Sequence, residues 1–219
     1  MAIASMQDLF LHTLKDVYYA EKAIAKALPK MMKKAQSEEL ATALEMHREE
    51  TLGQIEQLEQ IFEMLGKPAR GVKCEAMDGI LAEAQDHLAE IEDPHVRDAA
   101  IIASAQAVEH YEICRYGSLI AWANALGHDE MVGALQTILD QEKAADMKLS
   151  DLAEGVVNPV AVKEAGARET DGADQANESP QSSAQKSSSG AKAGRMSEQK
   201  PGKMADAGSA KKSAMKKAS

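Results

Sequence analysis

Residues 10–28 read FLHTLKDVYYAEKAIAKAL, and their apolar side chains recur at alternating steps of four and three residues. That spacing predicts an α-helix with one buried face. Glu21 takes the step between Val17 and Ile24, so its carboxylate should lie on that face. An ionised carboxylate in a core is so costly that it must be paired, protonated or bound to a cation. The stretch therefore predicts both a helix and a polar site inside the core.

Three further apolar stripes are interrupted in the same way, by Glu50, Glu109 and Glu142. Each of the four carboxylates lies about 12 to 16 residues from the start of its helix, so antiparallel helices could bring them to one level. A single such Glu is usually only solvated, but four at one level with no inward Lys or Arg favour one or two divalent cations. Adding polar neighbours one turn away gives the candidate metal ligands Glu21, His47, Glu50, Glu109, Glu112, Glu142 and Asp146.

This ligand set is rich in carboxylate oxygen and poor in imidazole, which suits iron, with manganese or zinc as alternatives. Two ions per subunit are expected. Around the set, Gln54 and Gln106 are expected to hydrogen-bond the carboxylates. His110 follows Glu109 directly and so should point about 100° away from the inner face, as a supporting or packing residue. Tyr18, Tyr111 and Tyr116 are interpreted as core aromatics rather than redox partners.

Capping residues predict the ends of the helices. Ser5 with Asp8 marks the first start, Pro29 should end or kink that helix, and Asp93-Pro94 is typical of a helix N-terminus. Gly127 and Gly155 should follow helix ends. The predicted helices span about residues 5–29, 38–65, 75–91, 94–126 and 129–154.

This pattern predicts an all-α, ferritin-like four-helix bundle, with a short extra helix in one long crossover. An up-down-up-down bundle with a packed side helix is the competing topology, because connection length alone does not exclude it.

The chain divides by composition into a bundle, residues 1–156, and a tail, residues 157–219. The bundle carries 14 basic and 28 acidic residues, and the tail carries 11 and 7. The tail is rich in Ser, Ala and Lys, lacks aromatic residues, and is predicted to be disordered. Its basic end could contact nucleic acid non-specifically, an anionic membrane surface or the acidic bundle, or could simply aid solubility.

Several classes of protein are disfavoured. Two cysteines, no leader and no stretch long enough to span a membrane indicate a reduced, cytoplasmic protein. The chain has no Gly-rich phosphate loop, nucleophile-base pair or base-stacking array, which argues against kinases, hydrolases and sequence-specific readers of DNA.

Over about residues 5–155 the chain resembles the YciE/YciF-type proteins of bacteria. This resemblance implies a ferritin-like four-helix bundle, often dimeric, that is linked to stress responses and has no settled enzymatic activity. The family's metal centre would draw on the four glutamates, with the other candidate ligands as neighbours. The segments that carry the resemblance are Ala20-Glu21, His47-Arg48-Glu49-Glu50-Thr51 with Gln54, residues 105–113 with Tyr116-Gly117, and Leu139-Asp140-Gln141-Glu142 with Asp146.

The chain departs from the wider di-iron pattern of Glu-x-x-His on two helices. Gly53 and Ala145 stand where those histidines would be, and the second helix has the reversed order His47-x-x-Glu50. Fewer imidazoles argue against full oxidase-type di-iron chemistry.

Three hypotheses follow from the sequence. The first is a metal centre that reacts with peroxide or dioxygen or holds iron. The second is a non-enzymatic helical protein that acts through dimerisation or partners. The third is a bundle tethered to DNA by its basic tail.

Overall fold

The computed structural model describes residues 3–164, and within them the regular structure is entirely helical. The all-α prediction is confirmed. Most of the predicted tail, residues 165–219, lies outside the described residues. Within residues 3–164, no helix combines the length and the hydrophobicity that a bilayer-spanning segment requires. The elements are α1 (Met6–Met32), α2 (Glu38–Met64), α3 (Glu75–Glu90), α4 (Pro94–Leu126), α5 (Asp129–Leu152) and a π-helical turn, η1 (Ala153–Val157).

Side-chain caps start α1 and α4 where the sequence predicts. The Ser5 hydroxyl accepts the backbone N–H of Asp8, and the Asp93 carboxylate accepts those of His95 and Val96 ahead of the helix that Pro94 opens. These bonds satisfy donors that the first helical turn leaves free. Gly127 closes α4 in the left-handed conformation, with φ 75°, which glycine adopts without a Cβ penalty.

Two predicted helix stops are wrong. α1 continues past Pro29 to Met32, because the side chain of Met31 is buried in the core and holds the last turn against it. α5 ends at Leu152, close to the predicted Glu154, but Gly155 does not stop the helical backbone as predicted. Helical backbone passes Gly155 through η1 and continues to residue 164. Val157 and Ala161 are buried there, so packing outweighs the weak stop signal of the glycine.

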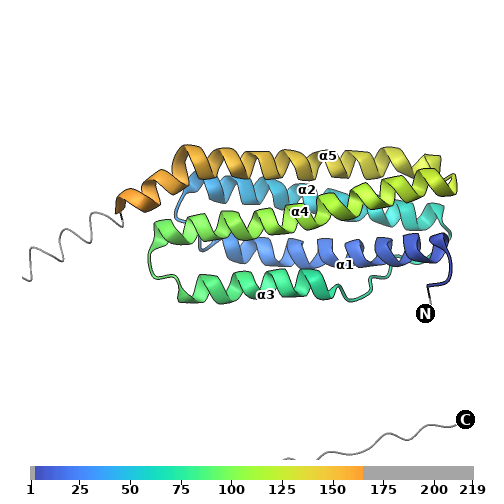
Figure 1. The fold of residues 1–219 in the computed structure, drawn as a ribbon, viewed down its shortest axis with the longest axis horizontal. Coiled ribbons are helices and arrows are strands. Elements are labelled where there is room, and N and C mark those ends of the chain that lie inside the picture. Colours follow the sequence, from blue (N-terminus) through green and yellow to red (C-terminus); the bar gives the residue numbers. More distant parts are fainter. Residues whose placement is uncertain (1–2, 165–219) are drawn as a thin grey trace, which may run out of the picture. The chain divides into compact units, whose positions relative to one another are not determined.

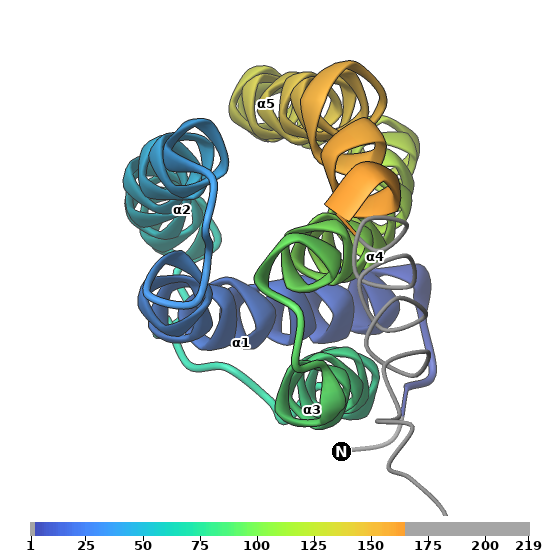
Figure 2. The ribbon, with the colours of Figure 1, turned by 90° about the vertical axis from the view of Figure 1, so that its left-hand side faces the viewer.

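The four long helices form a bundle in which α1 contacts α2 and α4, and α5 contacts the same two helices (Figure 2). α2 runs antiparallel to α1, and α5 antiparallel to α4, as expected for tight turns (Figure 1). The connection that contains α3 crosses from one end of the bundle to the other, so α2 and α4 run in the same direction. The one-crossover topology is therefore confirmed, with α3 packed outside against α1 and α4.

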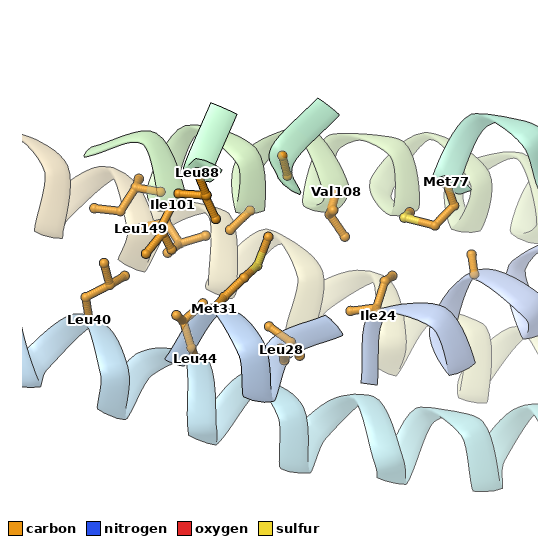
Figure 3. Packing of buried hydrophobic residues seen from close by; sticks show 14 of the residues in the cluster. Ile24, Leu28, Met31, Leu40, Leu44, Met77, Leu88, Ile101, Val108 and Leu149 are labelled. Carbon is orange, nitrogen blue, oxygen red and sulfur yellow. The ribbon is translucent and has the colours of Figure 1, made fainter. Parts of the chain in front are cut away.

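The apolar core consists of two clusters. One is built around Ile24, Leu28, Leu44 and Ile101, and is closed on its outer side by α3 (Figure 3). The other is built around Phe10, Leu14, Phe62, Leu119 and Leu135. Along every long helix the two clusters occupy opposite halves, and the polar candidate ligands lie between them.

Candidate metal centre

A layer of buried polar side chains separates the two clusters, and each long helix contributes to it. These side chains lie on the core-facing stripes of their helices, where the spacing of the apolar residues forces them inward. Its members and their exposed fractions are Glu21 (0 %) on α1, His47 (7 %) and Gln54 (1 %) on α2, Glu109 (1 %) and Glu112 (1 %) on α4, and Glu142 (0 %) on α5.

Four of these residues could hold a metal ion together. His47, Glu109, Glu112 and Glu142 each offer a ligand atom, and these atoms all lie within 4.8 Å of one another. His47 Nε2 lies 3.2 Å from Glu109 Oε1, yet neither ring nitrogen makes a hydrogen bond within the described residues. One carboxylate oxygen of each of the three glutamates also lacks a hydrogen-bond partner there. Buried polar atoms are normally satisfied, so this concentration of free acceptors fits a cation.

Glu21 joins the layer through hydrogen bonds. The hydroxyl of Tyr116 donates to Glu21 Oε1, while Glu21 Oε2 has no partner in the described part of the chain. On the opposite side, Gln54 Nε2 donates to Glu142 Oε1. Gln106 Nε2 donates to Asp146 Oδ1 over 3.1 Å, so both predicted glutamine contacts are confirmed. These donors orient the carboxylates from outside the cluster.

The protonation of the layer follows from its burial. Desolvation raises the pKa of Glu21, Glu109 and Glu112 well above the usual range, and the neighbouring carboxylates raise each of them further. Burial likewise raises the pKa of the Tyr116 hydroxyl, with Glu21 as the next cause. No Lys or Arg within residues 3–164 forms an ion pair with any of the buried glutamates. The layer must therefore retain protons or bind cations.

Two predicted ligands lie apart from the buried group. Glu50 is at the rim between α2 and α5 with 41 % of its side chain exposed, and its Oε2 lies 3.9 Å from His47 Nδ1. Asp146 is partly exposed and lies 3.2 Å from Nε2 of His110. His110 is itself mostly exposed, so it supports Asp146 rather than packing in the core.

A cavity of about 100 Å³ between α2 and α5 leads to the buried group. His47 and Glu109 form its inner end, and Glu50 and Lys148 lie among its other lining residues. The remaining lining residues are small or apolar, and include Ala144 and Ala145. The layer is thus closed by protein on most sides and reached from one.

Two features of this site were not predicted from the sequence. Tyr116 was expected to be a core aromatic, and it is fully buried, but its hydroxyl also points at Glu21. The signal was present, since Tyr116 continues the stripe of Glu109 two helical turns later. Lys148 at the cavity was not singled out, because its position shows only after α2 and α5 are placed side by side.

Comparison with known proteins then placed the chain in a family. A sequence family described as "Domain of unknown function (DUF892)" matches residues 5–161. The chain belongs to the DUF892 family. This DUF892 chain is 42 % identical over 166 residues to Protein YciF of Escherichia coli (strain K12), a match that covers 75 % of the chain and all of YciF. The resemblance to YciE/YciF-type proteins is therefore confirmed.

Solved structures agree with the DUF892 assignment. The crystal structure of the E. coli stress protein YciF is 43 % identical, with a TM-score of 0.67, and the match covers 71 % of the present chain and 99 % of YciF. YcfI of Rhodopseudomonas palustris is 55 % identical with the same TM-score, covering 68 % and 94 %. A Xanthomonas campestris protein that is 24 % identical shares the fold, with a TM-score of 0.57 over 73 % and 99 %.

Proposed function

We propose that this protein binds divalent transition-metal ions in the core of a ferritin-like bundle and serves in a stress response. One observation carries the metal proposal: ligand atoms of His47, Glu109, Glu112 and Glu142 lie within 4.8 Å of one another in a buried layer. The stress response is inferred from YciF, the E. coli relative, which is described as a stress protein.

The residues present fit such a metal. Carboxylate oxygens with one imidazole suit iron or manganese, and zinc can also use this set. The four buried glutamates would balance the charge of two divalent cations, which supports two ions per subunit. When bound, iron or manganese would supply redox chemistry toward peroxide or dioxygen. Alternatively, the site would hold iron reversibly as a store.

The chain's own groups would prepare the site. Gln54 orients Glu142, and Tyr116 holds a proton against Glu21. The apolar clusters on both sides keep bulk water away from the layer, which strengthens every electrostatic interaction inside it.

The test is the metal content of untagged protein, measured by elemental mass spectrometry after growth with iron and manganese. Wild type is expected to carry one or two ions per chain. A Glu109→Gln/Glu112→Gln variant should carry less than about a tenth of that, because two ligands lose their charge. The control is Glu45→Gln/Glu49→Gln, which removes the same charge from the exposed face of α2. A folded wild type that neither carries nor takes up iron(II), manganese(II) or zinc(II) would refute the proposal.

A second candidate is a purely structural polar layer in a non-enzymatic protein. Hydrogen bonds from Tyr116 to Glu21 and from Gln54 to Glu142, together with the raised pKa values, support a layer kept neutral by protons. In that case the wild type would fold without metal, and added metal would leave its unfolding temperature unchanged.

A further inference from the structure

The cavity between α2 and α5 suggests how a cation reaches the layer, an inference that rests on the proposed metal binding. We propose that this cavity is the path by which divalent cations enter, and that Glu50 and His47 form an outer cation site along it. Glu50 would then be a transit residue rather than a resident ligand of the buried cluster.

The cavity connects the surface with the cluster. Exposed Met46 and Lys148 lie among its lining residues, and buried His47 and Glu109 are at its inner end. Its volume of about 100 Å³ is several times the roughly 10–15 Å³ that holds one water molecule. A cavity on the far side of His47, walled by apolar residues such as Ile24 and Leu28, has only about 10 Å³. A cation that keeps part of its hydration therefore fits the first cavity and not the second.

His47 lies between an outer and an inner carboxylate. Its Nδ1 is 3.9 Å from Glu50 Oε2, and its Nε2 is 3.2 Å from Glu109 Oε1. The ring is 93 % buried, it lines the cavity, and within residues 3–164 neither nitrogen is hydrogen-bonded. Because metal–ligand bonds to nitrogen and oxygen are each about 2.1 Å long, one ion can reach both Glu50 and Nδ1. The next ligand inward, Glu109, is already beside the same ring.

The charges along the cavity favour a cation over an anion. Glu50 presents a carboxylate at the partly exposed end, between low-dielectric walls that focus the field, and the buried carboxyl group of Glu109 at the other end can exchange its proton for a cation. Lys148 is the basic residue in the lining, and its Nζ lies 3.4 Å from the thioether sulfur of Met46. The lysine charge should therefore slow cation uptake without blocking it.

The experiment is stopped-flow mixing of metal-free, full-length protein with cobalt(II), followed by ligand-field absorption, with the final stoichiometry from elemental analysis. Glu50→Gln is expected to slow loading about tenfold and to leave the final stoichiometry of the buried cluster unchanged, since it removes a charge and a ligand from the outer transit site and none from the cluster. Its matched control, Glu49→Gln, makes the same charge change one residue away on an exposed part of α2 and should load within about twofold of wild type.

Three further variants test the route itself. Ala145→Leu fills the cavity and should slow loading, whereas Ala125→Leu on the exposed face of α4 should not. Lys148→Gln should load faster than wild type, and it keeps the proposal testable if Ala145→Leu does not fold.

The outcomes separate the two proposals. If wild type binds cobalt and Glu50→Gln loads at the same rate as Glu49→Gln, the proposed route is wrong. The proposed metal site would not be affected by that result. Loss of an ion in Glu50→Gln would make Glu50 a resident ligand and would also overturn its transit role. A wild type that binds no cobalt would remove the proposed function itself.

Discussion

Two tyrosines make the same contact in different surroundings. Tyr116 donates to Glu21, which is fully buried, and Tyr18 donates to Glu59 over 2.7 Å, although Glu59 is exposed. A hydrogen bond is worth about 1 kcal/mol on average, but a buried acceptor left without its donor costs about 1–3 kcal/mol. The contribution of each hydrogen bond to the free energy of unfolding therefore depends on whether water can replace the tyrosine hydroxyl as the donor.

Tyr116→Phe in the metal-free protein is expected to lower the free energy of unfolding by about 2–3 kcal/mol, because Glu21 stays buried without its donor. Tyr18→Phe should cost about 1 kcal/mol or less, since water can solvate Glu59. Urea denaturation of both variants measures the difference. Equal losses would show that the Glu21 carboxyl finds another partner.

The raised pKa values of Glu21, Glu109 and Glu112 predict a pH dependence of stability. The unfolded chain releases these protons near pH 4.3, whereas the folded protein keeps them to higher pH. The contribution of these carboxyl groups to stability is thus complete below about pH 4.3, and it is lost as the pH rises toward their pKa values in the folded protein.

In chelator-treated protein, the free energy of unfolding of wild type should fall relative to that of Glu109→Gln/Glu112→Gln as the pH rises above about 4.3. The expected slope is about 1.4 kcal/mol per pH unit for each proton that the folded protein retains. Urea denaturation from pH 5 to 9 measures it. Parallel curves for the two proteins would contradict the expectation.

At the scale of elements, local chemistry predicts the helix starts better than the ends. Ser5 and Asp93 cap their helices as expected, and Ser37 caps α2 at its predicted start, because a cap depends only on neighbours within one turn. The stops at Pro29 and Gly155 fail, because buried Met31 and Val157 extend the helices by tertiary packing that the sequence does not display locally.

The candidate site, too, was predictable only in part. Helical periodicity placed Glu21, Glu109 and Glu142 inward, as the structure has them. Glu50 is about 60° from His47 around α2, and that angle alone does not decide between core and rim. The answer depends on where α5 packs, which the sequence does not give.

Two glycines in different elements should respond in opposite ways to alanine. A Cβ at Gly53, in the middle of α2, meets no atom within 4 Å, so Gly53→Ala should raise the free energy of unfolding by about 0.5–1 kcal/mol. A Cβ at Gly71, in the connection before α3, would lie 3.0 Å from the Cβ of Tyr19 and 3.2 Å from its Cα. Gly71→Ala should therefore destabilise by about 1–2 kcal/mol.

Urea midpoints of the two variants check this pair. A stabilising Gly71→Ala would mean that the connection moves away from α1 at little cost.

On the scale of the whole molecule, the candidate ligands come from helices far apart in sequence. His47 lies on α2, Glu109 and Glu112 on α4, and Glu142 on α5. A ligand held by three helices binds the folded chain and not the unfolded one, so it stabilises the entire bundle.

Saturating manganese(II), at about 100 times its dissociation constant, should therefore stabilise the protein by about 2.7 kcal/mol and raise the unfolding temperature by roughly 5–10 °C. The shift should be larger at pH 7.5 than at pH 5.5, because the metal must displace protons from the carboxyl groups. Calorimetry measures both values. Magnesium at the same concentration, and the Glu109→Gln/Glu112→Gln variant, control for general ionic effects.

The polar layer between the two apolar clusters has a consequence for how the bundle opens. Apolar contacts that would bind one half of the core to the other are replaced, at the level of Glu21 and Glu142, by carboxyl groups. We therefore expect the cooperativity of unfolding to be weakest at mid-length, and the two halves to behave as separate units of hydrogen exchange. A cation in the layer would join them, so that amides near Leu14 and amides near Ile101 exchange together.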